Sequence, residues 1–110
     1  MLFNLLPGTL DLLVLRALTD GPAHGYGVAR WVRESTGEAF AIEDGALYTA
    51  LHKLEKAGLL RAKWGVSEAN RRAKYYSLTA KGRRVLAEQT SMWRRSAGAL
   101  FKALDRKAPS

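Results

Sequence analysis

The chain has 110 residues, a formal net charge of +8 and no cysteine. This length suits one domain with one modest core, and 47% hydrophobic residues disfavour a disordered chain. The lack of cysteine excludes disulfides and thiolate metal sites, and it fits a reducing, cytoplasmic compartment. No stretch reaches the ~20 apolar residues that cross a bilayer. The apolar start, Met1 to Leu6, lacks a basic leader, so we do not expect a signal peptide.

The charge is unevenly distributed. Residues 1–52 carry three basic and six acidic side chains, a net charge of −3. Residues 53–110 carry fifteen basic and four acidic side chains, a net charge of +11. A concentrated positive charge favours a polyanionic partner, with nucleic acid first and an anionic membrane second.

Two helices are predicted before residue 40. The first runs from about Pro7 to Thr19, because proline is tolerated at a helix start and Asp20-Gly21-Pro22 ends the pattern. The second spans His24 to Ser35. Apolar residues recur at helical spacing in both and form the expected core, namely Leu10, Leu13, Val14 and Leu18, then Val28, Trp31 and Val32.

A third helix begins near Ile42 and stops at Gly58. Glu43 and Asp44 favour this start, because carboxylates are stabilised at the positive end of a helix dipole. The predicted buried face consists of Leu47, Ala50, Leu51 and Leu54.

The periodicity changes to two after the third helix, which indicates strands. Basic residues alternate with Leu60, Ala62 and Trp64 in the first segment, and polar residues alternate with Tyr76 and Leu78 in the second. The Gly-containing link from Gly65 to Arg72 predicts a hairpin with a long tip.

Thr79 can cap a last helix from about Ala80 to Leu104. At ~1.5 Å per residue this helix is longer than a three-helix head can cover. Its apolar stripe therefore needs another surface, most simply a second copy of the chain. The residues expected at this dimer interface, or at a ligand site within it, are Leu86, Gln89, Trp93, Ala97 and Leu100.

These elements predict a mainly α fold with a small β-hairpin wing. Residues 1–78 are expected to form a winged helix-turn-helix DNA-binding domain, and residues 79–110 a C-terminal dimerisation helix with a short tail. A major groove admits one helix, and side chains near the N-terminus of that helix reach the base edges. The polar face of the third helix offers Gly45, Tyr48, Thr49, His52 and Lys53 for this purpose.

Each of these residues suits a different contact. Gly45 lets the backbone approach closely, Thr49 suits a thymine methyl or a base edge, and Tyr48 and Lys53 suit phosphates. The alternative for His52 and the rest of the face is plain solvation. The hairpin adds basic side chains that suit phosphates or a minor groove, namely Arg71, Arg72 and Lys74.

Four other residues are ambiguous. Tyr75 and Tyr76 cannot both face outward on one strand, so we expect Tyr76 in the core and Tyr75 on the DNA side. We expect Trp64 to be structural at the base of the wing, and His24 to anchor a local turn.

The ordered motifs together resemble the PadR family of winged-helix regulators. The resemblance covers nearly the whole chain and extends to the compact subgroup with one C-terminal helix. Its residues are Gly8-Thr9-Leu10, Leu13-Val14-Leu15, His24-Gly25-Tyr26-Gly27, Gly45-Ala46-Leu47-Tyr48, Leu51, Leu54 to Leu59, Trp64, Arg72 to Tyr76, Leu78-Thr79 and Gly82.

The resemblance implies a homodimer held by the last helix, and repression at inverted-repeat operators. It also implies that Tyr48 contacts a phosphate. Ala73 departs from the family pattern, where many members carry Arg or Pro, and Arg71 could compensate. Some members present a tryptophan at the position of Trp93 to aromatic drugs, so a small aromatic effector is one expectation and ordinary interface packing the other.

Other function classes have weaker support. No Ser/His/Asp order, paired-carboxylate motif or phosphate-binding glycine loop indicates an enzyme, and no cofactor or metal is expected. A single-stranded RNA binder would expose stacking aromatic residues on a sheet. A dimeric drug-binding adaptor without DNA contact is the third alternative.

Overall fold

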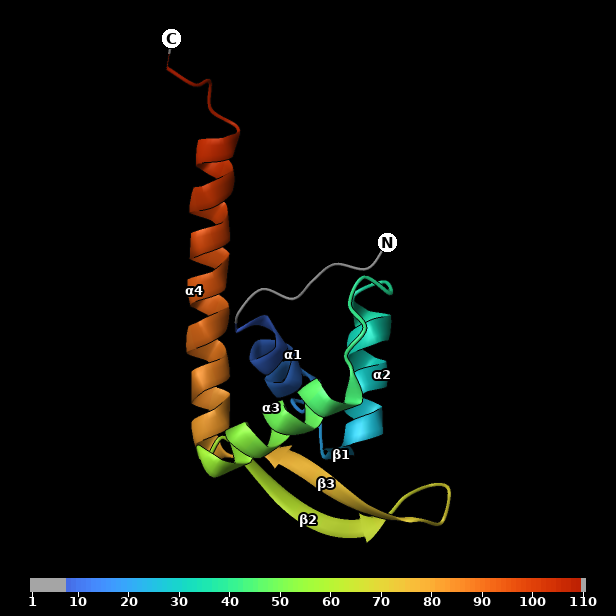
Figure 1. Cartoon of the computed structure of the whole chain (residues 1–110). Helices are drawn as coiled ribbons and strands as arrows, with labels where there is room; N and C mark the ends of the chain where they lie inside the picture. Colours follow the sequence, from blue (N-terminus) through green and yellow to red (C-terminus); the bar gives the residue numbers. More distant parts are fainter. Residues whose placement is uncertain (1–7, 110) are drawn as a thin grey trace.

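The computed structural model describes residues 8–109. Its elements follow in the order α1 (Thr9–Ala17), β1 (Ala23–His24), α2 (Gly25–Ser35), α3 (Asp44–Lys56), β2 (Leu60–Val66), β3 (Arg72–Leu78) and α4 (Ala80–Leu104) (Figure 1). Four helices and an antiparallel sheet make the mainly α fold with a β-hairpin wing that the sequence predicts. The segment Met1 to Leu6 and the expected helix start at Pro7 lie outside the described residues.

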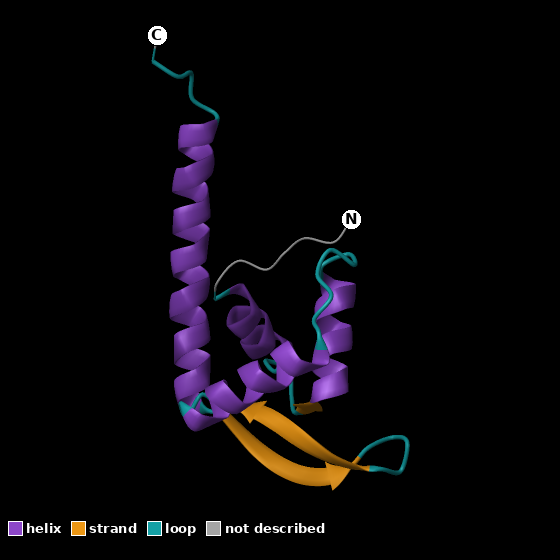
Figure 2. Ribbon diagram, viewed as in Figure 1, coloured by secondary structure: helices purple, strands orange, loops and turns teal. Residues whose placement is uncertain are grey.

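α1, α2 and α3 pack around one apolar core, with the sheet below them and α4 beside α1 (Figure 2). Leu15 joins the predicted core positions, whereas Leu10, Leu13 and Trp31 are only half-buried. Burial of each large apolar side chain contributes roughly 1.5–3 kcal/mol. The buried cluster consists of Val14, Leu15, Leu18, Val28, Leu47, Leu51, Leu54, Leu60 and Tyr76.

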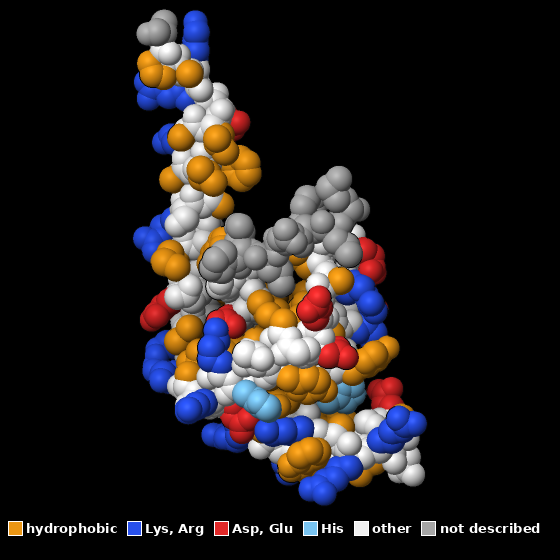
Figure 3. All heavy atoms as spheres, viewed as in Figure 1, with side chains coloured by type: hydrophobic (Ala, Val, Ile, Leu, Met, Phe, Trp, Pro, Cys, Tyr) orange, Lys and Arg blue, Asp and Glu red, His pale blue; other side chains and the backbone are white. Residues whose placement is uncertain are grey.

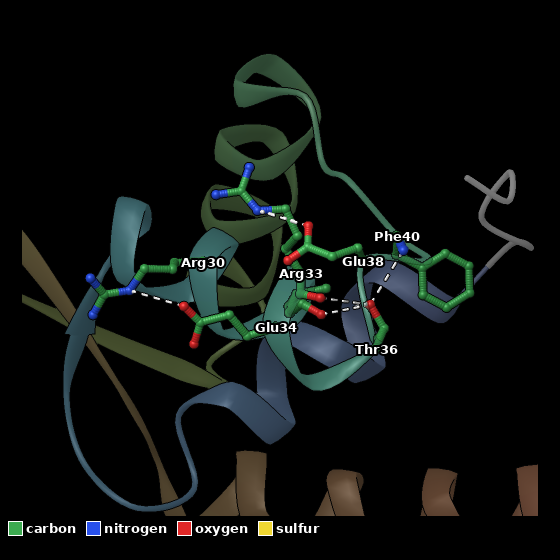
Figure 4. A network of polar contacts seen from close by, with 7 residues as sticks. Arg30, Arg33, Glu34, Thr36, Glu38 and Phe40 are labelled. Carbon is green, nitrogen blue, oxygen red and sulfur yellow. Dashed lines mark hydrogen bonds and ion pairs between the residues drawn. The ribbon is translucent and has the colours of Figure 1, made fainter. Parts of the chain in front are cut away.

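Hydrogen bonds at both ends of α2 orient the helix. At its start, His24 Nδ1 accepts from the Gly27 N–H at 3.1 Å, so the histidine caps the helix and anchors a turn, as predicted. At its end, the Thr36 hydroxyl donates to the Val32 carbonyl at 2.8 Å and accepts from the Phe40 N–H at 3.3 Å. Figure 4 shows this hydroxyl between the end of α2 and the segment that leads to α3. The network therefore fixes the connection between the two helices.

α3 ends where the sequence predicts. Gly58 adopts a left-handed conformation (φ 80°), and the Leu59 N–H donates back to the Leu54 carbonyl at 2.9 Å. This pattern satisfies carbonyls at the helix end and turns the chain directly into β2. Leu59 then accepts from the Thr79 N–H at 3.1 Å, which holds the start of α4 against the same turn.

The sheet has the strand order β1-β3-β2, and all its pairs are antiparallel. The hairpin strands are longer than predicted, and the link spans residues 67–71 instead of Gly65 to Arg72. Gly65 remains in the ladder opposite Ala73. The Tyr75 ring lies close above it, since a Cβ at Gly65 would be 3.2 Å from that ring. The short strand β1 was not predicted.

α4 begins and ends at the predicted residues. Thr79 caps the helix by accepting from the Gly82 N–H at 3.0 Å. The first turns contact α1, and the distal part extends beyond the other described elements (Figure 1). This projection raises the radius of gyration to 16.2 Å, against about 13 Å for a compact chain of this size. Within residues 8–109, no helix has both the length and the apolar character to cross a membrane.

Candidate nucleic-acid interface

α3 presents a polar face opposite its buried residues. The predicted buried positions, Leu47, Ala50, Leu51 and Leu54, all face the core. The predicted contact residues are all exposed, namely Gly45, Tyr48, Thr49, His52 and Lys53. Among residues 8–109, a Cβ at Gly45 would meet no atom of another element within 4 Å, so the described part of the chain leaves the backbone there open to a large partner.

Tyr48 connects this face to the start of α2. Its side chain is 49% exposed, and its ring lies beside the buried Gly25. A Cβ at Gly25 would lie 3.3 Å from the hydroxyl oxygen and from a ring carbon of Tyr48. The glycine therefore leaves the room that the tyrosine ring occupies at the junction of the two helices.

The Thr49 hydroxyl has a defined role within α3. It donates to the Gly45 carbonyl at 2.9 Å. Its proton is thus engaged in the helix, whereas its methyl group and its lone pairs remain available. Such a side chain can contact a thymine methyl or accept a hydrogen bond from a base, both of which the major groove offers.

The two wing arginines are exposed and differ in their surroundings. Arg71 is the last residue of the tip and Arg72 the first residue of β3. Cζ of Arg72 lies 4.6 Å from the ring centroid of Trp64, whereas the Arg71 guanidinium contacts no acidic or aromatic side chain among residues 8–109. Trp64 was expected to be structural at the base of the wing. Trp64 is 56% exposed, because the core on this face of the hairpin ends at the preceding pair, Ala62 and Tyr76, and its structural role stays a prediction.

The two predicted lysines already have acidic partners. Lys53 on α3 forms an ion pair with Asp11 on α1. Lys74 Nζ lies 3.2 Å from Glu55 Oε1, and this hydrogen bond raises the pKa of Lys74 above its usual value. Lys74 is therefore protonated at neutral pH. Each lysine must share its charge with a carboxylate, which distinguishes both from the arginines.

The structure places Tyr76 in the core, at 1% exposure, and Tyr75 outside it, as predicted. Tyr75 extends from the opposite face of β3 to Arg72 and Lys74. Its ring makes an edge contact with His24 at 5.4 Å, and its hydroxyl donates to the Val66 carbonyl at 3.3 Å. The contact of Tyr75 with DNA stays a prediction.

A groove of about 1090 Å³ unites these elements. It separates the hairpin from the start of α2 and from α3, and Figure 3 shows Lys and Arg side chains gathered over the hairpin. Sequence reasoning missed Tyr26 and Arg30 in its wall. Tyr26 is 68% exposed. The sequence could have indicated this, because Tyr26 does not share the apolar face of the second helix. The lining residues that matter here are Tyr26, Arg30, Tyr48, His52, Trp64, Arg71, Arg72, Lys74 and Tyr75.

The predicted interface residues of α4 lie away from this groove. Leu86 packs against the core, whereas Leu100 is 58% exposed. Gln89, Trp93 and Ala97 are half-buried between these limits. A second recess, of about 650 Å³, lies between α1 and α4; Arg94 and Arg95 line it, but Trp93 does not. Among residues 8–109 no three acidic or histidine side chains gather to hold a metal ion.

Known proteins resemble this chain in both sequence and fold. The sequence model of the Transcriptional regulator PadR-like family matches residues 14–88. An uncharacterised protein X from Lysinibacillus sphaericus is 31% identical over 91 residues, which are 82% of this chain and 83% of the relative. A PadR family transcriptional regulator from Eggerthella lenta is 33% identical, with a TM-score of 0.76, over 91% of this chain and 85% of the other.

A likeness of fold alone extends to Bacillus subtilis PadR, solved in complex with operator DNA. That chain is 22% identical, with a TM-score of 0.65, and the match covers 92% of this chain and 49% of PadR. The matched family consists of transcriptional regulators, which confirms the expectation that this protein is not an enzyme. Since the family match covers more than half of the sequence, the chain belongs to the PadR-like family of transcriptional regulators.

Proposed function

We propose that the chain is a repressor that binds an inverted-repeat operator in duplex DNA as a homodimer. One observation carries the proposal: exposed residues of α3 and both wing arginines line a single groove. Residues 1–78 act as the DNA-binding domain, and residues 79–110 as the dimerisation helix and tail. The solved complex of Bacillus subtilis PadR with operator DNA supports this choice of partner.

In this proposal α3 enters the major groove. That groove is about 12 Å wide and admits one helix of about 10–12 Å diameter. Thr49 and His52 then face base edges, and Gly45 allows close approach. Tyr48 and Lys53 lie at the sides of the helix, where they can reach phosphates.

The wing binds the adjacent phosphates. Arg71 and Arg72 supply planar donor groups that match phosphate oxygens in pairs. Lys74 adds a third positive charge beside Arg72, and Tyr75 offers its side chain to DNA from the other face of β3. Positive charge on this hairpin, close to α3, gives the surface the electrostatic footprint of a nucleic-acid interface.

A second copy of the chain covers the distal part of α4. Phe101 and Leu104 are 59% and 65% exposed there, beside the equally exposed Leu100. Figure 3 shows hydrophobic side chains along this projecting part. A two-fold dimer places the two α3 helices in successive major grooves, about 34–36 Å apart.

A small aromatic effector is part of the same proposal. The effector site in the dimer is flanked by the Trp93 rings of the two subunits, and binding of the effector there relieves repression. The ligand must favour a dimer whose α3 helices are wrongly spaced, because a ligand with equal affinity for both forms shifts nothing. We also place the protein in the cytoplasm, in keeping with its lack of cysteine.

Binding to defined duplexes tests the proposal. Genomic footprinting of the protein selects the operator, and fluorescence anisotropy then compares operator, scrambled duplex and single-stranded RNA over a range of salt. We expect the operator to bind tightest, with two chains per duplex. We expect Arg72→Ala to weaken binding to both duplexes alike and to flatten the salt slope by about 0.9. A monomeric protein, or stronger binding to RNA than to any duplex, would contradict the proposal.

A further inference from the structure

The wing carries an arginine stacked on a tryptophan. Trp64 pairs with Lys74 across the hairpin, and Val66 pairs with Arg72, so Trp64 and Arg72 are diagonal neighbours on one face. Diagonal pairs are within reach of aromatic and long side chains. The 4.6 Å from Arg72 Cζ to the Trp64 ring centroid is within the range of a cation–π contact.

The Trp64 ring contacts Arg72 and lies outside the apolar core. On this face of the hairpin, the preceding pair, Ala62 opposite Tyr76, is the last that packs against the core, and the Trp64 indole beyond it is 56% exposed. Both Trp64 and Arg72 line the groove described above. The ring is thus an exposed platform at the edge of the proposed DNA interface.

Stacking orients the guanidinium without consuming its donors. Cζ of Arg72 lies over the ring, and a guanidinium that stacks on an aromatic face keeps its in-plane N–H groups for other acceptors. A free arginine side chain loses much rotamer freedom when it binds a phosphate, and a side chain already ordered on a ring loses less.

The other wing cations lack this combination. Arg71 has no aromatic or acidic side-chain partner among the described residues, and Lys74 is bound to Glu55. Arg72 is therefore the wing cation that is both oriented and free of a carboxylate in residues 8–109.

We propose that Trp64 is a positioning residue, which holds the Arg72 guanidinium ready for a DNA phosphate. This inference rests on the proposed function, because it names the part of the wing that prepares a phosphate contact. Trp64 acts through Arg72 in this scheme and makes no essential contact with DNA itself.

A double-mutant cycle on operator affinity tests the inference. We expect Trp64→Leu to weaken binding roughly two- to fivefold, the range of an exposed cation–π pair. Trp64→Phe keeps an aromatic face and should restore most of the affinity. In an Arg72→Ala background, Trp64→Leu should cause no further loss. Val66→Ala, an exposed apolar change on the same face, serves as the control and should leave affinity unchanged.

Additive losses from Trp64→Leu and Arg72→Ala would overturn the inference, because they would show that the ring contacts DNA independently. Failure of Trp64→Phe to restore affinity would overturn it too. Loss of the same contact should lower the melting temperature of Trp64→Leu by no more than a few degrees, and a larger fall would show that the ring supports the hairpin instead of positioning Arg72.

An NMR experiment on the free protein separates this inference from the proposed function. The Arg72 side-chain protons should be shifted upfield by the Trp64 ring, and the shift should vanish in Trp64→Leu and persist in Trp64→Phe. Unshifted Arg72 protons would overturn the stacking even if operator binding is strong. Shifted protons in a protein that binds no duplex would instead count against the proposed function alone.

Discussion

The ammonium group of Lys53 on α3 lies against the carboxylate of Asp11 on α1, forty-two residues earlier in the sequence. The Lys53 side chain is 62% exposed and that of Asp11 is 29% exposed. α1 also contacts α4. The ion pair therefore links α3, the helix proposed to enter the major groove, to α1, against which the proposed dimerisation helix α4 packs. A phosphate that binds Lys53 must compete with Asp11.

We therefore expect Asp11→Asn to raise affinity for DNA. In the wild type, a phosphate that binds Lys53 separates it from Asp11, and the freed carboxylate then attracts a cation from solution. This uptake of a cation offsets the cation that DNA releases when its phosphate is neutralised. Without the carboxylate, the slope of log affinity against log salt should steepen by up to about 0.9. Stability should change by only about 0–1 kcal/mol, the usual contribution of an exposed ion pair.

The matched control for that experiment is Asp20→Asn, which removes the same charge from an exposed residue just after α1. Asp20 has no ion pair with Lys53. If both variants raise affinity equally, the gain comes from net charge alone and the competition at Lys53 is refuted.

Two substitutions at Thr49 distinguish the two base contacts that its geometry allows. Thr49→Val keeps the methyl group and removes the oxygen, whereas Thr49→Ser keeps the oxygen and removes the methyl group. If the contact is to a thymine methyl, Thr49→Ser should relax the preference at one base pair by ~1–3 kcal/mol, and Thr49→Val should retain it. The opposite pattern indicates an accepted hydrogen bond. Affinities for single-base operator variants provide the measurement, and equal losses on random DNA would argue against any base contact.

Gly82→Ala should destabilise the fold. A Cβ at this position would lie 2.1 Å from the Leu59 carbonyl oxygen, which accepts the Thr79 N–H. The backbone of the α3–β2 turn must therefore move, or the hydrogen bond that starts α4 must break. Overpacking of this kind costs about 1–3 kcal/mol, so thermal unfolding should shift down by several degrees.

Gly98→Ala is the companion variant in the same helix. A Cβ there meets nothing within 4 Å in the part of the chain that the structure describes, and alanine is a better helix former by about 0.8–1.0 kcal/mol. Its melting temperature should therefore rise. A fall in both variants would show that the close approach at Gly82 is not the cause.

Local signals predicted much of this fold. The start of α4 followed from the Thr79 cap, and the end of α3 followed from Gly58, because each signal lies within a few residues of its effect. The buried face of α3 followed from its helical period. β1 was missed because two residues carry no period, and only their pairing with Tyr75 and Tyr76 makes them a strand.

The candidate site was predicted less completely. The polar face of α3 and the wing arginines were identified from type and spacing alone. The partners of the lysines were not, since Lys53 meets Asp11 only through the packing of α3 on α1. The exposure of Trp64 was missed for a similar reason. Strand alternation assigns its side of the hairpin, but it does not show where along that side the core ends.

Leu100→Glu should dissociate the proposed dimer. Leu100 lies on the apolar stripe of α4 and is 58% exposed in the single chain. Loss of a buried leucine costs about 1.5–3 kcal/mol per chain, and two-fold symmetry doubles it, so the dissociation constant should rise roughly a hundredfold or more. Ala99→Glu is the control, because Ala99 is also exposed but lies about 100° around the helix from Leu100.

Sedimentation of the two variants measures the mass directly, and anisotropy with one or two operator half-sites measures the consequence. A Leu100→Glu monomer should bind a single half-site with little loss, because α3 and the wing are unchanged. It should lose the added affinity of the full inverted repeat, which depends on two joined copies. A variant that keeps the mass of the wild type would show that Leu100 lies outside the contact between chains. Dissociation with unchanged affinity for the full repeat would show that α4 is dispensable for operator binding.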